Sequence, residues 1–181
     1  MVKPKVATAS LAGCFGCHMS ILDIDDRILQ LIQLVEFDKS PIDDLKEFSG
    51  RCAIGLIEGG CCNEENVRVL REFRQHCDVL ISVGECAICG GIPAMRNTIP
   101  LQECLDEAYR NGPTVHNATG QYPNDPDLPL LLDKVYPCHE VVKIDYHIQG
   151  CPPAADAIWA ALTALLKQQP IMLPYELIKY D

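Results

Sequence analysis

The sequence lacks any long apolar run. No stretch of about 18 consecutive apolar residues occurs among its 181 positions, which excludes a helix that spans a membrane. The charged residues near its start are not followed by the apolar stretch that a secretory signal peptide contains. We therefore expect a protein of the cytoplasm with no membrane span.

The sequence also has few basic residues compared with acidic ones. The chain has 15 Lys and Arg residues against 25 Asp and Glu residues, so its formal net charge is −10. A surface this acidic repels phosphate groups, which argues against nucleic acid or anionic lipid as a partner. Internal repeats and low-complexity tracts are absent as well, while hydrophobic residues make up 48% of the chain, as in a folded protein. We expect one domain that covers residues 1–181.

Cysteine, by contrast, is abundant. The 11 cysteines are an odd number, and the chain is long enough to fold without disulfide staples. Without an export signal, metal or redox chemistry explains them better than disulfides do. No nucleophile–base pair, phosphate loop or pair of carboxylates is apparent, so we expect no complete active site in this chain alone.

Short apolar runs alternate with segments of helical periodicity along the chain. This alternation predicts right-handed βαβ units, and hence an α/β fold with a flavodoxin-like open, mostly parallel sheet and helices on both faces. Residues 112–139, with Tyr122, form a long irregular segment that we expect to face a partner. The strands are expected at residues 5–11, 52–57, 78–83 and 141–146, and the helices at residues 18–35, 64–76, 101–110 and 152–167, the last with proline in its first turn.

Glycine-flanked cysteines follow the predicted strands. Because parallel strands end at one edge of the sheet, these loops should meet there. An iron–sulfur cluster needs four soft anionic ligands around it, and this edge can supply them for one [4Fe–4S] cluster. A zinc site that only braces an interaction module could use the same four thiolates, and the sheet would also suit a flavodoxin-like carrier of flavin. The candidate ligands are Cys14, Cys17, Cys86 and Cys151.

Four motifs point to a known family. Residues 14–17 (CFGC) are similar to the C-x-G-C loop of the small subunit of [NiFe] hydrogenases, and residues 57–59 (IEG) resemble its E-G turn. Residues 83–91 (VGECAICGG) are similar to its V-G-x-C-A-x-x-G-G loop, and residues 150–153 (GCPP) to its last ligand motif. The motifs occur in the same order and extend over nearly the whole chain. This family is related to the 20 kDa subunit of respiratory complex I.

The resemblance implies a place in an electron-transfer chain. In that family these cysteines hold the cluster nearest the nickel–iron centre, which belongs to a separate large subunit. Cys86 is then the third ligand, although Cys89 competes with it because the two form a C-x-x-C of their own. Only about 14 residues follow the last predicted helix, without further cysteine, so the chain looks like the short small subunit of cytoplasmic NAD-reducing hydrogenase. Electrons would leave through this one cluster toward diaphorase subunits with flavin and iron–sulfur groups.

Other polar residues at this edge allow two interpretations. Glu58 could cap the following helix or, as the resemblance implies, serve as a polar contact or proton relay toward the large subunit. Residues 18–20 (HMS) depart from the Ser/Thr-Glu that usually follows the second cysteine. We expect His18 to be a first-turn helix residue or a hydrogen-bond donor to cluster sulfur rather than an iron ligand. Glu85 is expected to be solvated or interfacial.

The remaining cysteines are expected to pack rather than to bind metal. Cys61 and Cys62 lie at the active edge, where a redox or ligand role is the alternative to packing near the cluster. The others read as inert core residues. These are Cys52, Cys77, Cys104 and Cys138.

Overall fold

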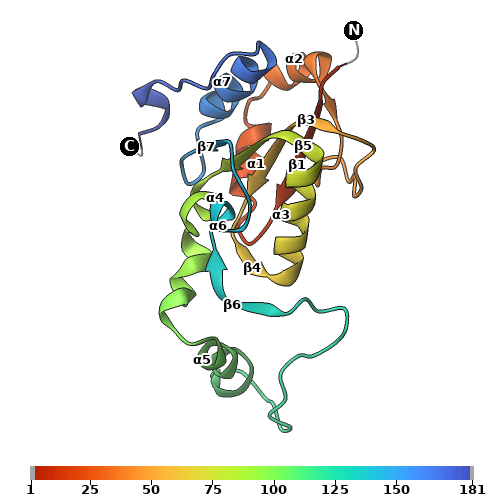
Figure 1. Cartoon of the computed structure of the whole chain (residues 1–181). Coiled ribbons are helices and arrows are strands. Elements are labelled where there is room, and N and C mark those ends of the chain that lie inside the picture. The colour runs from red at the N-terminus through yellow and green to blue at the C-terminus, as the bar shows by residue number, and fades with distance from the viewer. Residues whose placement is uncertain (1–2, 180–181) are drawn as a thin grey trace.

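A computed structural model describes residues 3–179 and places a five-stranded sheet at the centre of the molecule (Figure 1). The strand order is β2-β1-β3-β5-β7, and every neighbouring pair is parallel. Counted along the chain, the five strands stand in the order 2-1-3-4-5, which is the flavodoxin-like arrangement and confirms the predicted α/β fold. The strands are β1 (Lys5–Ser10), β2 (Glu36–Phe37), β3 (Cys52–Glu58), β5 (Cys77–Val83) and β7 (Tyr146–Ile148).

Helices cover both faces of this sheet. On one face α1 (Gly16–Leu22), α2 (Arg27–Leu34) and α7 (Ala155–Leu166) pack against side chains such as Val6 of β1. On the other face α3, α4 and α6 pack against side chains such as Ala7, the next residue of β1. Successive strand residues point to opposite faces, so the near-continuous apolar strands fill two cores at once. The second set is α3 (Glu64–His76), α4 (Glu85–Cys89) and α6 (Cys138–Val141).

The bounds predicted for helix α3, residues 64–76, are confirmed. Local signals define both of its ends. The side chain of Asn63 caps the helix by accepting a hydrogen bond from the backbone N–H of Asn66 at 2.8 Å. Acidic residues occupy the first turn and basic residues the last, which suits the helix dipole. Leu70 and Phe73 are fully buried on the inner face.

The single helix predicted over residues 18–35 is wrong, because the structure has two helices there. α1 ends at Leu22, and the chain turns at Asp25, whose φ of 59° is left-handed. Aspartate tolerates that conformation, and its charge opposes continuation at the negative end of a helix dipole. The turn lets Ile24 and Leu31 both reach the core.

The strand predicted over residues 141–146 is also misplaced. Residues 138–141 form α6, and the segment that pairs with β5 is Tyr146–Ile148. Val142 and Ile144 pack instead against the α3-side core, the core on the sheet face that α3, α4 and α6 cover. Their apolar side chains are thus partly buried although they lie outside the sheet. The last helix begins at Ala155 rather than at residue 152, so its two prolines precede the helix instead of occupying its first turn.

A second, two-stranded sheet and a projecting segment complete the described residues. β4 (Cys61–Asn63) pairs antiparallel with β6 (Leu131–Tyr136), so the predicted irregular segment 112–139 is irregular only up to β6. The helix predicted over residues 101–110 is α5 (Leu101–Asp106), continued by a π-helical turn, Glu107–Asn111. No residue from 91 to 130 is buried, and this segment extends away from the sheet at the bottom of Figure 1. Short 3₁₀ turns lie at Ile92–Thr98 and Tyr175–Leu177.

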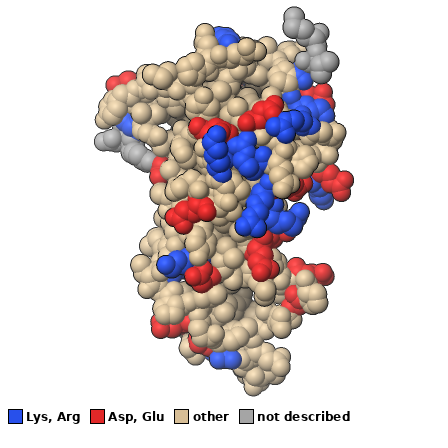
Figure 2. Space-filling view, viewed as in Figure 1, with Lys and Arg blue, Asp and Glu red and all other residues tan. Residues whose placement is uncertain are grey.

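The surface carries charges of both signs. On the face seen in Figure 2, basic side chains gather near α3 among acidic ones. Among residues 3–179, none of the helices has the length and apolar character needed to cross a bilayer.

Candidate metal centre at the carboxyl edge of the sheet

One small cavity brings the four candidate ligands together. It has a volume of about 80 Å³ and lies where the loops after β1, β3, β5 and β7 meet. By comparison, about 10–15 Å³ suffices for a single water, so a group of several atoms has room. Glu58, Glu85 and Pro152 also line it. The cysteines that line it are Cys14, Cys17, Cys86 and Cys151.

The first loop carries two of these thiols on a tight turn. Phe15, between them, adopts the left-handed conformation with φ 66° and ψ 7°, and α1 begins at the next residue. The backbone N–H of Gly16 lies 3.4 Å from Cys14 Sγ and donates to it. Such N–H contacts stabilise a thiolate and can also reach the sulfurs of a bound cluster.

Two positions at the ends of the loop after β5 require glycine, because cysteine sulfur atoms occupy the space that a side chain would need. Gly84 has φ 82°, and an ideal Cβ there would lie 2.3 Å from Cys17 Sγ. Gly91 has φ 50°, and a Cβ there would lie 2.9 Å from Cys86 Sγ. A side chain at either position would therefore displace a candidate ligand.

The same loop distinguishes the two cysteines of the C-x-x-C at residues 86–89. Cys86, half-buried in the first turn of α4, lines the cavity. Cys89 is exposed, and its Sγ lies 3.2 Å from the backbone oxygen of Glu85 and 3.3 Å from Oε2 of the same residue. The arrangement therefore favours Cys86 as the third ligand.

The loop with Cys151 is tied to the loop with Cys86 by Glu85. The backbone N–H of Glu85 donates to the backbone oxygen of Gly150 at 3.1 Å, and Glu85 Oε1 accepts from the N–H of Gly150 at 3.2 Å. Sequence reasoning took Glu85 for a solvated or interfacial residue and missed this bracing role. Its position directly after the strand-ending glycine was the available signal.

Two of the cavity thiols, Cys17 and Cys86, have a pKa above the ordinary value of a cysteine. Burial raises the pKa of Cys17, and the neighbouring carboxylate of Glu58 raises it further. Burial also raises the pKa of Cys86. Binding of a cationic group must therefore release protons from these thiols. Within residues 3–179, no three Cys, His, Asp or Glu groups are arranged so that they could hold a single metal ion.

One interpretation expected Glu58 to cap the helix that follows it, but the structure shows other partners for its carboxylate. It is 3% exposed, and its Oε2 accepts a hydrogen bond from the backbone N–H of His18 at 3.1 Å, in the first turn of α1. Its Oε1 accepts from the hydroxyl of Ser10 at 2.6 Å. Burial raises the pKa of Glu58, but hydrogen bonds from His18 and Ser10 outweigh it, so the pKa is lowered and the carboxylate is charged.

His18 lies in the first turn of α1, as expected, and is buried. Its Nε2 lies 2.9 Å from the hydroxyl of Thr8, and its Nδ1 lies 3.3 Å from Oε1 of Glu58. It does not line the cavity. Of the two alternatives expected for His18, the structure supports a first-turn helix residue, whose ring nitrogens face protein oxygens.

Most of the other cysteines pack in the α3-side core. Cys61 is fully buried and hydrogen-bonds with Cys138, whose Sγ lies 3.4 Å from the backbone oxygen of Gly59. Cys62 instead lies 3.3 Å from the amide oxygen of Asn66, and none of these three cysteines lines the cavity. Cys52 and Cys77 lie opposite each other in β3 and β5 and are fully buried, whereas Cys104 is half-buried in α5.

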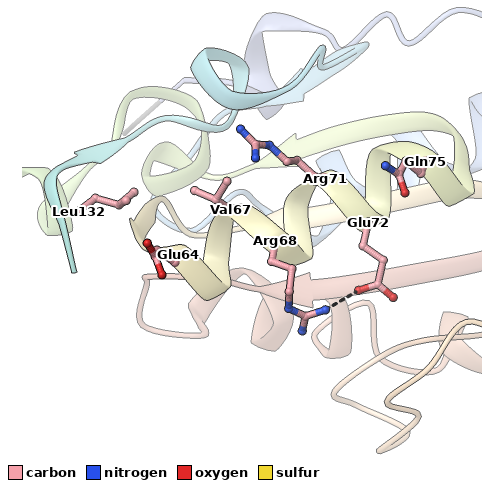
Figure 3. A pocket seen from close by; sticks show the side chains of 7 residues that line it. All are labelled: Glu64, Val67, Arg68, Arg71, Glu72, Gln75 and Leu132. Carbon is pink, nitrogen blue, oxygen red and sulfur yellow. Dashed lines mark ion pairs between the residues drawn. The ribbon is translucent and has the colours of Figure 1, made fainter. Parts of the chain in front are cut away.

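A larger groove lies elsewhere, along α3 (Figure 3). It has a volume of about 480 Å³ and is lined mainly by polar side chains of that helix. Arg68 in this groove forms an ion pair with Glu72 at 3.6 Å, drawn as the dashed line in Figure 3. None of the cavity cysteines borders the groove, so it is separate from the candidate metal centre.

Comparison with known proteins identifies the family of the chain. The family described as "NADH ubiquinone oxidoreductase, 20 Kd subunit" matches residues 14–165. The NAD-reducing hydrogenase HoxS subunit delta of Cupriavidus necator is 51% identical over 180 residues, which cover 99% of this chain and 86% of that protein. An iron-sulfur subunit of the F420-non-reducing hydrogenase of Archaeoglobus profundus is 30% identical over 178 residues, and the match spans 90% of this chain and only 56% of that relative.

A solved structure extends the likeness to three dimensions. A chain in the crystal structure of an NAD+-reducing [NiFe]-hydrogenase in the H2-reduced state superposes with a TM-score of 0.94 at 50% sequence identity. The match covers 99% of both chains.

Proposed function

Because the chain belongs to the family of the NADH ubiquinone oxidoreductase 20 Kd subunit, as a small subunit of NAD-reducing [NiFe] hydrogenase, we propose that it holds a single [4Fe–4S] cluster. The cluster would lie between the nickel–iron centre of a large subunit and the diaphorase subunits with flavin and iron–sulfur groups. When bound, such a cluster accepts and releases single electrons, whereas H2 yields two at a time.

The observation that carries this proposal is the cavity shared by the four thiols. Three loops contribute them, and the loop after β3 closes the remaining side with Glu58 and Gly59. Thiolates are the ligands that iron–sulfur clusters prefer. Gly84 and Gly91 keep the space beside two of the sulfurs clear. The donor set and the free space therefore both fit the cluster.

The zinc alternative fits the same cavity less well. In a four-cysteine zinc site every sulfur lies about 2.3 Å from one ion, so the sulfurs converge on a point. In residues 3–179 the thiols instead surround a volume with room for several atoms, and no three groups are positioned for one ion. This arrangement favours a cluster with a ligand at each of four corners.

The exposure of the site supports a partner that covers it. Cys14 and Cys151 are exposed, although ligands of a redox cluster are usually shielded from water. A large subunit docked on this edge would bury them and bring its nickel–iron centre close to the cluster. All 11 cysteines are free, which suits the reducing cytoplasm that we propose as the compartment.

Glu58 is the residue that we propose for a proton relay at this boundary. It borders the cavity, and its charged carboxylate can accept a proton released when H2 is split. The hydrogen bonds from Ser10 and His18 also give it a bracing role, so the two roles must be separated by experiment.

The experiment that tests the cluster is the measurement of iron and acid-labile sulfide in the anaerobically purified complex. The iron and sulfide contents and the absorbance spectrum should show one four-iron, four-sulfide cluster per chain in addition to the clusters of its partners. Replacing Cys151 should remove the iron and sulfide of that one cluster. Zinc in place of iron, in a colourless chain, would refute the proposal. Flavin fluorescence after denaturation of this chain would instead support the flavin-carrier alternative.

A further inference from the structure

The turn between Cys14 and Cys17 contains an unusual backbone conformation. Phe15 has a φ of 66°, in the left-handed region that glycine readily adopts and a bulky aromatic residue rarely does. Gly16, which could adopt it without strain, is the next residue and does not. A strained residue between two candidate ligands must be held in place by its surroundings, and such residues cluster at functional sites.

The aromatic ring of Phe15 is held by His18. The two rings are stacked, with centroids 4.5 Å apart and an interplanar angle of 9°. His18 is only 1% exposed, so its ring forms a fixed platform rather than a mobile surface side chain. The side chain of Phe15 provides no cap for α1, and Glu58 supplies a carboxylate oxygen to the first turn instead.

A hydrogen bond holds the His18 ring on one side, and on the other side its Nδ1 faces a carboxylate oxygen without forming a hydrogen bond. Nε2 lies 2.9 Å from the hydroxyl of Thr8 in β1, and that hydroxyl lies 2.9 Å from the hydroxyl of Ser40. On the other side, Nδ1 lies 3.3 Å from Glu58 Oε1 at the end of β3. The ring thus contacts β1 and β3 directly, and the Thr8 hydroxyl links it to Ser40 in the segment after β2.

We propose that Phe15 and His18 form a clamp that fixes the Cys14–Cys17 turn in the geometry that the cluster needs. His18 acts as a positioning residue: it contacts Phe15, not the cluster, and transmits the rigidity of the sheet to the two thiols. Partners of this kind orient metal ligands and tune the bound group. The clamp rests on the proposed function, since it positions ligands of the proposed cluster.

A matched pair of variants tests the clamp in the purified hydrogenase complex. His18→Phe keeps a flat ring that can stack on Phe15 but removes both ring nitrogens. Thr8→Val removes the hydroxyl that faces Nε2 and preserves the side-chain shape. His76→Phe is the control, because His76 stacks in the same way on Phe48, at 4.5 Å and 7°, and does not line the cavity. The readouts are the rate of iron release to a chelator and the EPR spectrum and reduction potential of the reduced cluster.

We expect Thr8→Val and His18→Phe to release the iron of this cluster about 10- to 100-fold faster and to shift its EPR spectrum and potential. His18→Gln, whose amide can reach Thr8, should recover part of the slow release, and His76→Phe should match the wild type. Wild-type release and spectra in both test variants would overturn the clamp alone. Failure of both variants to assemble would assign the residues to folding and also overturn it. A wild-type chain without iron would refute the proposed function and the clamp together.

Discussion

Cys17 and Gly84 approach so closely that no side chain can stand at position 84. An ideal Cβ on Gly84 would lie 2.3 Å from Cys17 Sγ, closer than real Cβ atoms come to a neighbour. The two residues belong to α1 and to the turn between β5 and α4, so the contact joins two of the loops that border the cavity. The backbone of Gly84, with φ 82° and ψ 162°, is itself open almost only to glycine.

Gly84→Ala should therefore remove the cluster or make it labile. The added methyl group must push Cys17 away, and the backbone strain adds about 1–3 kcal/mol. Iron content per chain and the EPR signal in the purified complex measure the effect. Gly50→Ala is the control, because a Cβ there meets nothing within 4 Å and its φ is not left-handed. Full iron content in Gly84→Ala would show that Cys17 is not a ligand.

Serine at any one of the four cavity cysteines should remove or cripple the cluster. A hydroxyl is a harder and poorer ligand for iron than a thiolate. Cys89→Ser and Cys104→Ser should leave the spectrum unchanged, because neither thiol lines the cavity. A Cys89→Ser variant without cluster, next to a loaded Cys86→Ser variant, would reverse our assignment of the third ligand. The positions to be changed are Cys14, Cys17, Cys86 and Cys151.

Glu58→Gln separates proton transfer from bracing. Glutamine keeps the shape of the side chain and can still accept one of the two hydrogen bonds, but it cannot carry a proton in the same way. We expect unchanged assembly and EPR spectrum, with H2-dependent turnover lowered by about 10²-fold. Glu72→Gln on α3, remote from the cavity, is the control. Loss of assembly would favour the structural role, and unchanged turnover would place the proton path wholly in the partner subunit.

The cavity edge should make the chain depend on its partner. Exposed Cys14 and Cys151 leave the site open on one side, so the chain produced alone should be poorly soluble or lack the cluster. Co-production with a hydrogenase large subunit should restore solubility and iron content. Size-exclusion chromatography with iron analysis measures both. A stable, cluster-loaded monomer without affinity for such a subunit contradicts this expectation.

Asp38 should stabilise the segment over residues 38–49 in a pH-dependent way. Burial raises its pKa, but hydrogen bonds from Ser49 and the ammonium of Lys5 outweigh this and hold the pKa at about 2, below its ordinary 3.8. A lowered pKa means that the stabilisation is complete above about pH 4 and is lost as the pH falls toward 2. Hydrogen exchange of this segment in the complex, corrected for intrinsic rates, should show that loss.

Asp38→Asn should already lack the protection at pH 7 and show no further loss below pH 4. Leaving the donors around Asp38 without a charged acceptor costs about 1–3 kcal/mol, which corresponds to exchange about 5- to 150-fold faster. Asp156→Asn, at an exposed ion pair with Arg27, is the control and should change little. Equal protection in Asp38→Asn and the wild type at pH 7 would rule out the effect.

Local sequence patterns were sufficient to predict the bounds of an element when its start, its end and its buried face are all encoded within that element. α3 has its cap, its charged ends and its apolar face inside residues 63–76, so its bounds followed directly. The meeting of cysteines at one edge also followed, because parallel strands joined by helices must end on the same side. Choosing Cys86 over Cys89 needed the family resemblance, since their spacing alone treats the two alike.

Tertiary contacts decided what local patterns could not. Residues 18–35 have continuous helical periodicity, yet the chain turns at Asp25, and this turn buries Ile24 within it and Leu31 in the helix that follows. The apolar residues near 142 pack against α3, so β7 forms further along the chain. The contacts of Glu58 with Ser10 and His18 join residues 40 or more positions apart, and only the folded sheet brings them together. Residue order determines propensity and strand direction, whereas packing in the core determines which competing local preference prevails.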